Sequence, residues 1–327
     1  VSISEYDIHE FNIIGTFFCQ QNSVTSVCAH ASLCMTINNM NFEKIGLPNP
    51  GIVTAECVNK IVGIDHRNIK FGINKDGLSK EEIQEVLKKF ELSITWTDFF
   101  ENPNVEYNEY IYRYIESRCP VLLVFTTDST ALHVVPVLGH TLNSDMWRPE
   151  AEPAYSVQDS RLNYRSAAAW VDHFIIHDDN FGMYLCLPVD TLKRVTLPKH
   201  DPTFRANFAV VVLPSGVTTP AWEVEWASVV IVKSLLQTLK KTLKKREIDL
   251  DEWSNRIISS DNVHPPRPIV VRTFLTTKEN YAKSLEQADF QGNLFSESDK
   301  KKLVKDLPFR FWLSEITLPD LYTANKN

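Results

Sequence analysis

The sequence predicts an α+β protein whose helices come first and whose largely antiparallel sheet follows. Three stretches near the N-terminus carry apolar residues at helical spacing: 23–40, 78–90 and 105–118. Four β-branched, apolar runs then form two pairs, each separated by a short polar turn: 119–127 with 131–140, and 170–177 with 183–189. Helices that precede strands, instead of alternating with them, are typical of the α+β class.

The helices are expected from their own residues. In the first, apolar side chains recur every three or four positions: Ala29, Leu33, Ile37 and Met40. The second begins at Ser79, and Glu82 three residues later completes a capping box. The third ends just before Pro120, which cannot continue a helix.

The second pair of strands flanks DDNFG, and the glycine of this segment favours a hairpin turn. A polar, proline-bearing stretch, 141–168, lies between the two pairs and is expected to be a long surface insertion. Its Trp147 and Tyr155 would then be available to border a cleft.

A second series of elements begins after residue 190. It consists of a strand, a long amphipathic helix and two further strands: 205–216, 221–248, 264–275 and 309–318. We therefore expect two domains, residues 1–190 and residues 191–327. The second would be an accessory α+β domain of unknown role. Neither repeats nor low-complexity tracts interrupt this organisation.

Composition excludes several classes of protein. The 327 residues are 43% hydrophobic and carry a net charge of −7, which argues against nucleic acid as a partner. No apolar run reaches the length of a membrane span, and no signal-peptide layout is present, so we expect no membrane insertion and a cytoplasmic location. The first residue is Val1, which indicates a mature product or a piece of a longer protein. The six cysteines are scattered without metal-ligand spacing, and we expect reduced thiols, no metal and no cofactor.

One cysteine has the setting of a nucleophile. Cys28 stands at the predicted start of a helix, where free N–H groups and the helix dipole favour a thiolate. Gln20 and Gln21 precede it by eight and seven residues, and a side-chain amide there can donate to an oxyanion together with the N–H of Cys28. His133 opens an apolar strand, where an imidazole needs a polar partner.

The orienting group for His133 is expected at the end of FIIHDDN. Asp178, Asp179 and Asn180 all offer an oxygen that could accept the imidazole N–H, and Asp178 is preferred over the other two. The order glutamine, cysteine, histidine, acid is a known arrangement for nucleophilic catalysis.

The remaining histidines are expected to point elsewhere. His30 lies two positions after Cys28 on the helix, His140 belongs to the opposite face of its strand, and His177 alternates away from Asp178. Cys34, six residues after Cys28, is expected in the core. A metal site built on His173 and His177 lacks a third ligand nearby.

These segments resemble the papain-like cysteine peptidases: QQNSVTSVCAHASL, SRCPVLLVF, ALHVVPVLGH and FIIHDDNFG. Among them the bacteriocin-processing (double-glycine) peptidases and their bacterial relatives are the most similar, over roughly residues 12 to 190. The resemblance implies a papain-like fold with Cys28 as nucleophile, His133 as base and acid, Asp178 as orienter, and Gln21 or Gln20 in the oxyanion hole. The chain departs from the family at Ala29, where glycine is usual, and at Asp179, where proline often stands.

The expected activity is therefore that of a cysteine peptidase that hydrolyses a peptide or related amide through a thioester. Two alternatives remain open: transfer of the acyl group to an amine at the same site, or an inactive papain-like fold kept as an interaction or regulatory protein. The expected partner is a protein or peptide substrate, with a regulatory partner for residues 191–327.

Overall fold

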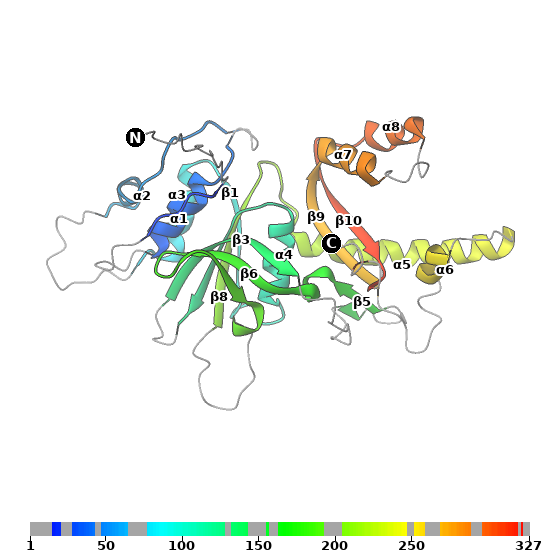
Figure 1. Cartoon of the computed structure of the whole chain (residues 1–327), viewed down its shortest axis with the longest axis horizontal. Helices are drawn as coiled ribbons and strands as arrows, with labels where there is room; N and C mark the ends of the chain where they lie inside the picture. The colour runs from blue at the N-terminus through cyan, green and yellow to red at the C-terminus, as the bar shows by residue number, and fades with distance from the viewer. Residues whose placement is uncertain are drawn as a thin grey trace, which may run out of the picture.

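The computed structural model describes residues 15–20, 28–42, 47–64, 77–127, 132–142, 155–156, 163–192, 205–246, 252–258, 269–288, 296–319 and 322. Within them the protein is a mixed α+β structure, as predicted (Figure 1). Its helices are α1 (Cys28–Asn38), α2 (Ala55–Val62), α3 (Lys80–Lys89), α4 (Tyr107–Glu116), η3 (Ala167–Trp170), η4 (Val189–Leu192), α5 (Ala221–Arg246), α6 (Glu252–Ile258), α7 (Lys278–Ala288) and α8 (Glu297–Lys305). Its strands are β1 (Ser93–Asp98), β2 (Val121–Thr126), β3 (Leu132–Leu142), β4 (Tyr155–Ser156), β5 (Asn163–Ser166), β6 (Val171–Asp178), β7 (Gly182–Pro188), β8 (Arg205–Leu213), β9 (Ile269–Thr277) and β10 (Arg310–Thr317).

The larger sheet has the strand order β1-β8-β2-β3-β6-β7, and each neighbouring pair is antiparallel. Successive side chains of a strand point to opposite faces. Leu122 and Val124 of β2 accordingly pack with α1, α2 and α3, while Leu123 and Phe125 pack with α4. Because helices cover both faces, β2 is buried along its whole length and reads as a continuous apolar run.

The predicted helices and strands of the first half are found close to their expected bounds. The capping box of α3 is present: Ser79 Oγ accepts the N–H of Glu82 at 3.2 Å, and Glu82 accepts the N–H of Ser79 at 2.8 Å. α2 is a helix that apolar periodicity does not predict. Its signals are local, since Thr54 caps its start and Gly63 ends it with a φ of 72°.

The smaller sheet has the order β10-β9-β5-β4, with β5 parallel to β9. α5 packs on this sheet through Val229 and Leu236, and Figure 1 shows the helix running beneath β9 and β10 and beyond them. A buried ion pair connects the two parts of the molecule, since Arg113 of α4 lies 2.9 Å from Glu225 of α5.

The division of the chain at residue 190 does not follow the sheets. β8 comes after that residue, yet it lies between β1 and β2 in the larger sheet, where its apolar run AVVVL completes the core. β4 and β5 come before it, yet they belong to the smaller sheet. The stretch 141–168 is therefore only in part a surface insertion, because Tyr164 and Arg165 of β5 are buried. Trp147 lies outside the described residues.

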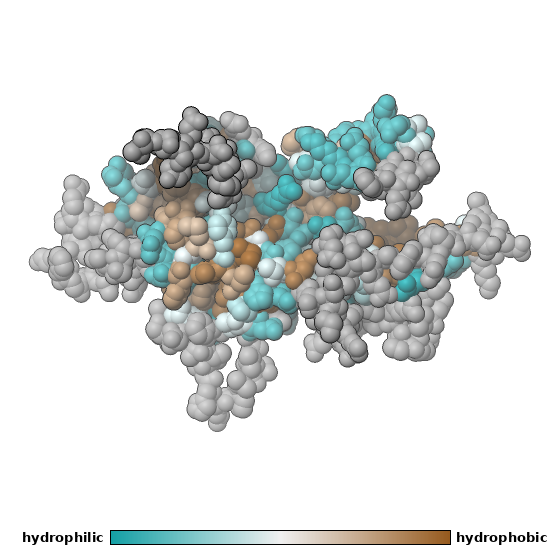
Figure 2. Space-filling view, in the orientation of Figure 1, coloured by the Kyte–Doolittle hydropathy of each residue, from teal (hydrophilic) through white to brown (hydrophobic). Residues whose placement is uncertain are grey.

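Among the described residues, no helix combines the length and the apolar character that crossing a membrane requires. The surface over α7 and α8 is largely hydrophilic in Figure 2, in keeping with α8, which buries none of its residues. The surface of α5 is different, since Trp222, Trp226 and Leu235 are each about half exposed.

Candidate active site

Cys28 is the first residue of α1, and packing of this helix places its thiol beside the start of β3. α1 is buried from Ala29 to Ile37. One turn after Cys28, Ser32 Oγ donates to the backbone carbonyl of Val134 at 2.7 Å, which ties the helix to β3. Cys28 Sγ lies 4.0 Å from the carbonyl oxygen of Leu132. His133 directly follows Leu132 in the chain, so the thiol lies beside the backbone that leads into His133.

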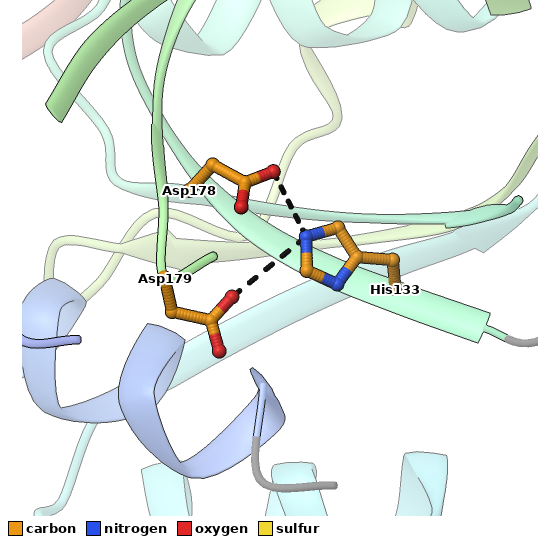
Figure 3. Close-up of side chains that lie close together, drawn as sticks. All are labelled: His133, Asp178 and Asp179. Carbon is orange, nitrogen blue, oxygen red and sulfur yellow. Dashed lines mark hydrogen bonds and ion pairs between the residues drawn. The ribbon is translucent and has the colours of Figure 1, made fainter. Parts of the chain in front are cut away.

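His133 is the second residue of β3 and is buried, with 8% of its surface exposed. It lies opposite Phe125 of β2, and the two rings meet edge to face with centroids 5.4 Å apart. Its Nε2 lies 3.0 Å from Asp178 Oδ2 (Figure 3). Since Asp178 engages Nε2, Nδ1 is the ring nitrogen left for the thiol of Cys28.

Asp178 is the last residue of β6, and the turn that follows orients its carboxylate. Oδ1 accepts the backbone N–H groups of Asn180 at 2.8 Å and Phe181 at 3.1 Å, while Oδ2 accepts from His133. Gly182, with a φ of 128°, completes the turn in a conformation that favours glycine. Of the three candidate orienting groups, Asp178 makes the hydrogen bond, and Asn180 instead supports Asp178 through its N–H.

Asp179 is the third member of the cluster in Figure 3. Its Oδ1 lies 3.7 Å from His133 Nε2. The side chain is 1% exposed, and neither carboxylate oxygen has a hydrogen-bond partner among the described residues. Burial therefore raises the pKa of Asp179, although the positive charge of His133 opposes the rise.

The pKa values of His133 and Asp178 move in opposite directions. Burial of His133 by itself would lower its pKa, but hydrogen bonds and charges from Asp178 and Cys28 outweigh this effect and raise it to about 10. Burial of Asp178 by itself would raise its pKa, but His133 and the N–H groups of Asn180 and Phe181 outweigh it and hold the pKa below its usual value. The pair therefore favours an imidazolium beside a carboxylate.

A metal ion would need the same nitrogen as this hydrogen bond. Three residues each offer one potential ligand atom, and these atoms lie within 4.8 Å of one another: His133, Asp178 and Asp179. Nε2 of His133 is already the atom that Asp178 engages at 3.0 Å. Orientation of the imidazole and ligation of a metal are therefore competing uses of this cluster.

Of the two glutamines expected in the oxyanion hole, only Gln20 belongs to the described residues. Gln20 is exposed at the end of the described segment 15–20, whereas Gln21 lies outside the described residues. Cys19, which precedes Gln20, places its Sγ 3.3 Å from the carbonyl oxygen of Ala31 in α1. Burial and the charge of Asp179 raise the pKa of Cys19 to about 11. The segment therefore reaches the region of Asp179 and α1.

The histidines expected to point elsewhere do so. His30 is buried and bonds Asn59 at 2.8 Å, and His140 pairs with Glu116. His173 bonds Thr141 at 3.2 Å, and His177 bonds Thr16 at 2.6 Å, so His173 and His177 have separate partners. Cys34 is a core residue, as predicted, and burial raises its pKa to about 12.

Sequence reasoning does not single out the residues that hold the segment 15–20, namely Thr16, Asn39 and Tyr184. They belong to no catalytic pattern, and only the alternation of His177 away from Asp178 indicates that His177 must find a polar partner of its own.

No family model matches the chain, and no curated protein matches it. Its chemistry is therefore argued from the geometry above.

Proposed function

We propose that the protein is a papain-like cysteine peptidase, of the kind that includes the bacteriocin-processing peptidases. The observation that carries the proposal is the position of His133, which bonds Asp178 through Nε2 and interacts with the Cys28 side chain. A cysteine, an imidazole and a carboxylate in this order supply a nucleophile, a proton carrier and an orienting group.

The reaction would proceed by acyl transfer to sulfur. The Cys28 thiolate attacks the carbonyl carbon of a peptide, and the π electrons move onto oxygen. The N–H of Cys28 and the amide of Gln21 or Gln20 stabilise that oxyanion, each donor contributing about 3 kcal/mol. The C–N bond then breaks as His133 gives its proton to the leaving amine. Water, deprotonated by His133, attacks the thioester, and the acid product leaves with the thiol restored.

Two features support an active enzyme over a decayed fold. Both carboxylate oxygens of Asp178 accept hydrogen bonds, Oδ2 from His133 and Oδ1 from the backbone of the turn. The turn thus fixes the carboxylate, and the carboxylate orients the imidazole. His30, which follows Ala29 at the position where the family usually has glycine, is buried and turns toward Asn59, with which it makes a hydrogen bond of 2.8 Å. The substrate we propose is a protein or peptide.

The test compares wild type with Cys28→Ala and, as a matched control, Cys186→Ala, which removes an exposed cysteine of β7. Iodoacetamide labelling at residue 28 is mapped by mass spectrometry in wild type and in His133→Ala. Release of p-nitrophenol from p-nitrophenyl acetate measures acylation.

We expect Cys28→Ala to abolish acylation above background and Cys186→Ala to retain it. We also expect His133→Ala to slow labelling of Cys28 by about a hundredfold or more, the lower end of the range for a missing general base. Unchanged acylation in Cys28→Ala, or unchanged labelling in His133→Ala, would refute the assignment. New peptide termini that a proteome gains with wild type but not with Cys28→Ala would then identify the substrate.

A further inference from the structure

The segment 15–20, here called the strap, connects the two elements that carry the site. One of them is α1, which begins with Cys28, and the other is the hairpin of β6 and β7, which carries Asp178. Four consecutive strap residues make contacts with these elements or with Asn39, which directly follows α1: Thr16, Phe17, Phe18 and Cys19.

On the hairpin side, the hydrogen bonds between the strap, His177 and Tyr184 are consistent with a single assignment of donors and acceptors. The backbone N–H of Tyr184 donates to His177 Nδ1 at 3.2 Å, so this nitrogen carries no proton. Nε2 of His177 is then the donor to Thr16 Oγ1 at 2.6 Å. Thr16 in turn donates its hydroxyl and its backbone N–H to the oxygen of Tyr184, at 2.9 and 2.8 Å. Both ring nitrogens of His177 and both donors of Thr16 therefore have partners in this network.

The environment of His177 keeps this arrangement in a single state. The side chain is fully buried, and burial lowers its pKa, which favours the neutral imidazole that the network requires. The rings of Phe18 and Tyr184 lie edge-on to it, at 5.4 and 4.8 Å between centroids. Tyr184 has a φ of 55°, which is rare for a residue with a bulky side chain and persists only where the surroundings impose it.

On the helix side, Asn39 holds the backbone of the strap. Its side chain accepts the N–H of Phe17 and donates to the carbonyl of Phe17 at 2.9 Å, so both backbone groups of this residue are paired. Cys19 Sγ lies 3.3 Å from the carbonyl oxygen of Ala31, in the first turn of α1. The next residue along the chain is Gln20.

We propose that the strap positions Gln20, its last residue and a candidate donor of the oxyanion hole, with Thr16, Asn39, His177 and Tyr184 as positioning residues that act through it. This inference rests on the proposed peptidase function. An oxyanion donor contributes fully only when it is held in place before the reaction, since a mobile amide must be ordered in each transition state. The strap supplies that order by attaching the chain immediately before Gln20 to both sides of the site.

The proposal separates two reactions of the same thiol. Alkylation of Cys28 by iodoacetamide displaces iodide at a saturated carbon and forms no oxyanion. Acylation by p-nitrophenyl acetate forms a C–S bond, passes through an oxyanion, and breaks the C–O bond to release p-nitrophenolate. Loss of positioning in the oxyanion hole lowers the second rate and leaves the first unchanged.

The experiment measures both rates in the full chain for Thr16→Val and Asn39→Ala, which remove the two attachments separately. Thr16→Ser keeps the hydroxyl and serves as the conservative variant. Asn280→Ala, at an exposed position of α7, is the matched control for the asparagine. Acylation is corrected for the rate of Cys28→Ala, and alkylation is followed on the peptide that contains Cys28.

We expect Thr16→Val and Asn39→Ala each to lower the acylation rate at least about tenfold, short of the roughly hundredfold loss of a donor itself. Alkylation should stay within about twofold of wild type, and Thr16→Ser and Asn280→Ala should retain both rates. Equal loss of both rates in Thr16→Val and Asn39→Ala, or loss of neither, would overturn the proposal. If wild-type acylation does not exceed that of Cys28→Ala, the peptidase function itself fails, which is a separate outcome.

Discussion

The pKa of His133 offers the most direct test of the site, because its rise depends on one named hydrogen bond. Asp178 lies 3.0 Å from Nε2 and is the largest of the influences that raise this pKa to about 10. Asp178→Asn keeps the size of the side chain and an oxygen acceptor while it removes the charge. The desolvation of the imidazole, which lowers its pKa, stays in place.

The magnitude follows from the strength of such a bond. A hydrogen bond to a charged group contributes about 1.5–3 kcal/mol, which at 1.36 kcal/mol per pH unit corresponds to roughly one to two pH units. We therefore expect the titration midpoint of His133 to fall from about 10 to roughly 8–9 in Asp178→Asn. Histidine ring resonances in NMR spectra, assigned with His133→Gln, report this midpoint directly.

Stability should depend on pH with a definite sign. The folded pKa of His133 lies above its ordinary value of 6.5, so its contribution is complete below pH 6.5 and is lost as the pH rises through about 10. The pKa of Asp178 is lowered, so its contribution is present above its ordinary value of 3.8 and is lost as the pH falls through the lower folded value. Urea unfolding should show wild type more stable than Asp178→Asn by about 2 kcal/mol near pH 7. This difference should narrow as the pH rises through about 10, and the part that comes from the N–H groups of Asn180 and Phe181 should remain.

Asp179→Asn is the matched control. Its carboxylate is 3.7 Å from the same nitrogen and lacks a hydrogen bond among the described residues, and its pKa is raised because burial disfavours the charge. We expect this variant to lower the pKa of His133 less than Asp178→Asn and to unfold at the same or a higher urea concentration. An unchanged His133 midpoint in Asp178→Asn, or a larger fall in Asp179→Asn, would refute the assignment of the orienting acid.

Three further predictions concern the rest of the molecule. Ser79→Ala removes the cap of α3 and should cost about 1 kcal/mol in urea unfolding; a cost as small as that of the exposed Lys283→Ala would contradict the capping role. Glu225→Gln leaves the buried Arg113 with its charge uncompensated on that side, and should cost about 3 kcal/mol by the same measurement. Cys34 and Cys119, whose pKa values burial raises to about 12, should resist alkylation at pH 8 until urea unfolds the protein, as peptide mapping can show; prompt labelling of either would contradict their place in the core.

Local elements of the structure could be predicted from the sequence, because their causes lie within a few residues. The capping box at Ser79 and Glu82 requires only backbone and side chains three positions apart, and it is present as expected. The hairpin around DDNFG and the apolar strand that His133 opens depend on alternation and turn residues, which a sequence displays. The alternation along β6 also predicts that His177 points away from Asp178, and this is found.

Local patterning alone does not separate Asp178, the residue preferred from the sequence, from Asp179 and Asn180. All three follow one strand, and their separation from His133 depends on the bulges that shift the register of β6 against its neighbours. The place of β8 is similar. Its apolar run predicts a buried strand, but its insertion between β1 and β2 depends on pairing between segments that lie far apart in the chain, such as Thr126 with Arg205 and Ser93 with Leu213.

The sequence by itself therefore determined most of the helices and strands of the first half and the types of groups that the site would need, since these follow from short-range periodicity and side-chain chemistry. Tertiary structure alone decided that Asp178 makes the bond to His133, that β8 completes the sheet, and that Thr16, Asn39, His177 and Tyr184 hold the strap before Gln20. The physical reason is that each of these facts is a contact between segments far apart in the chain, which forms only when the sheets and helices pack together.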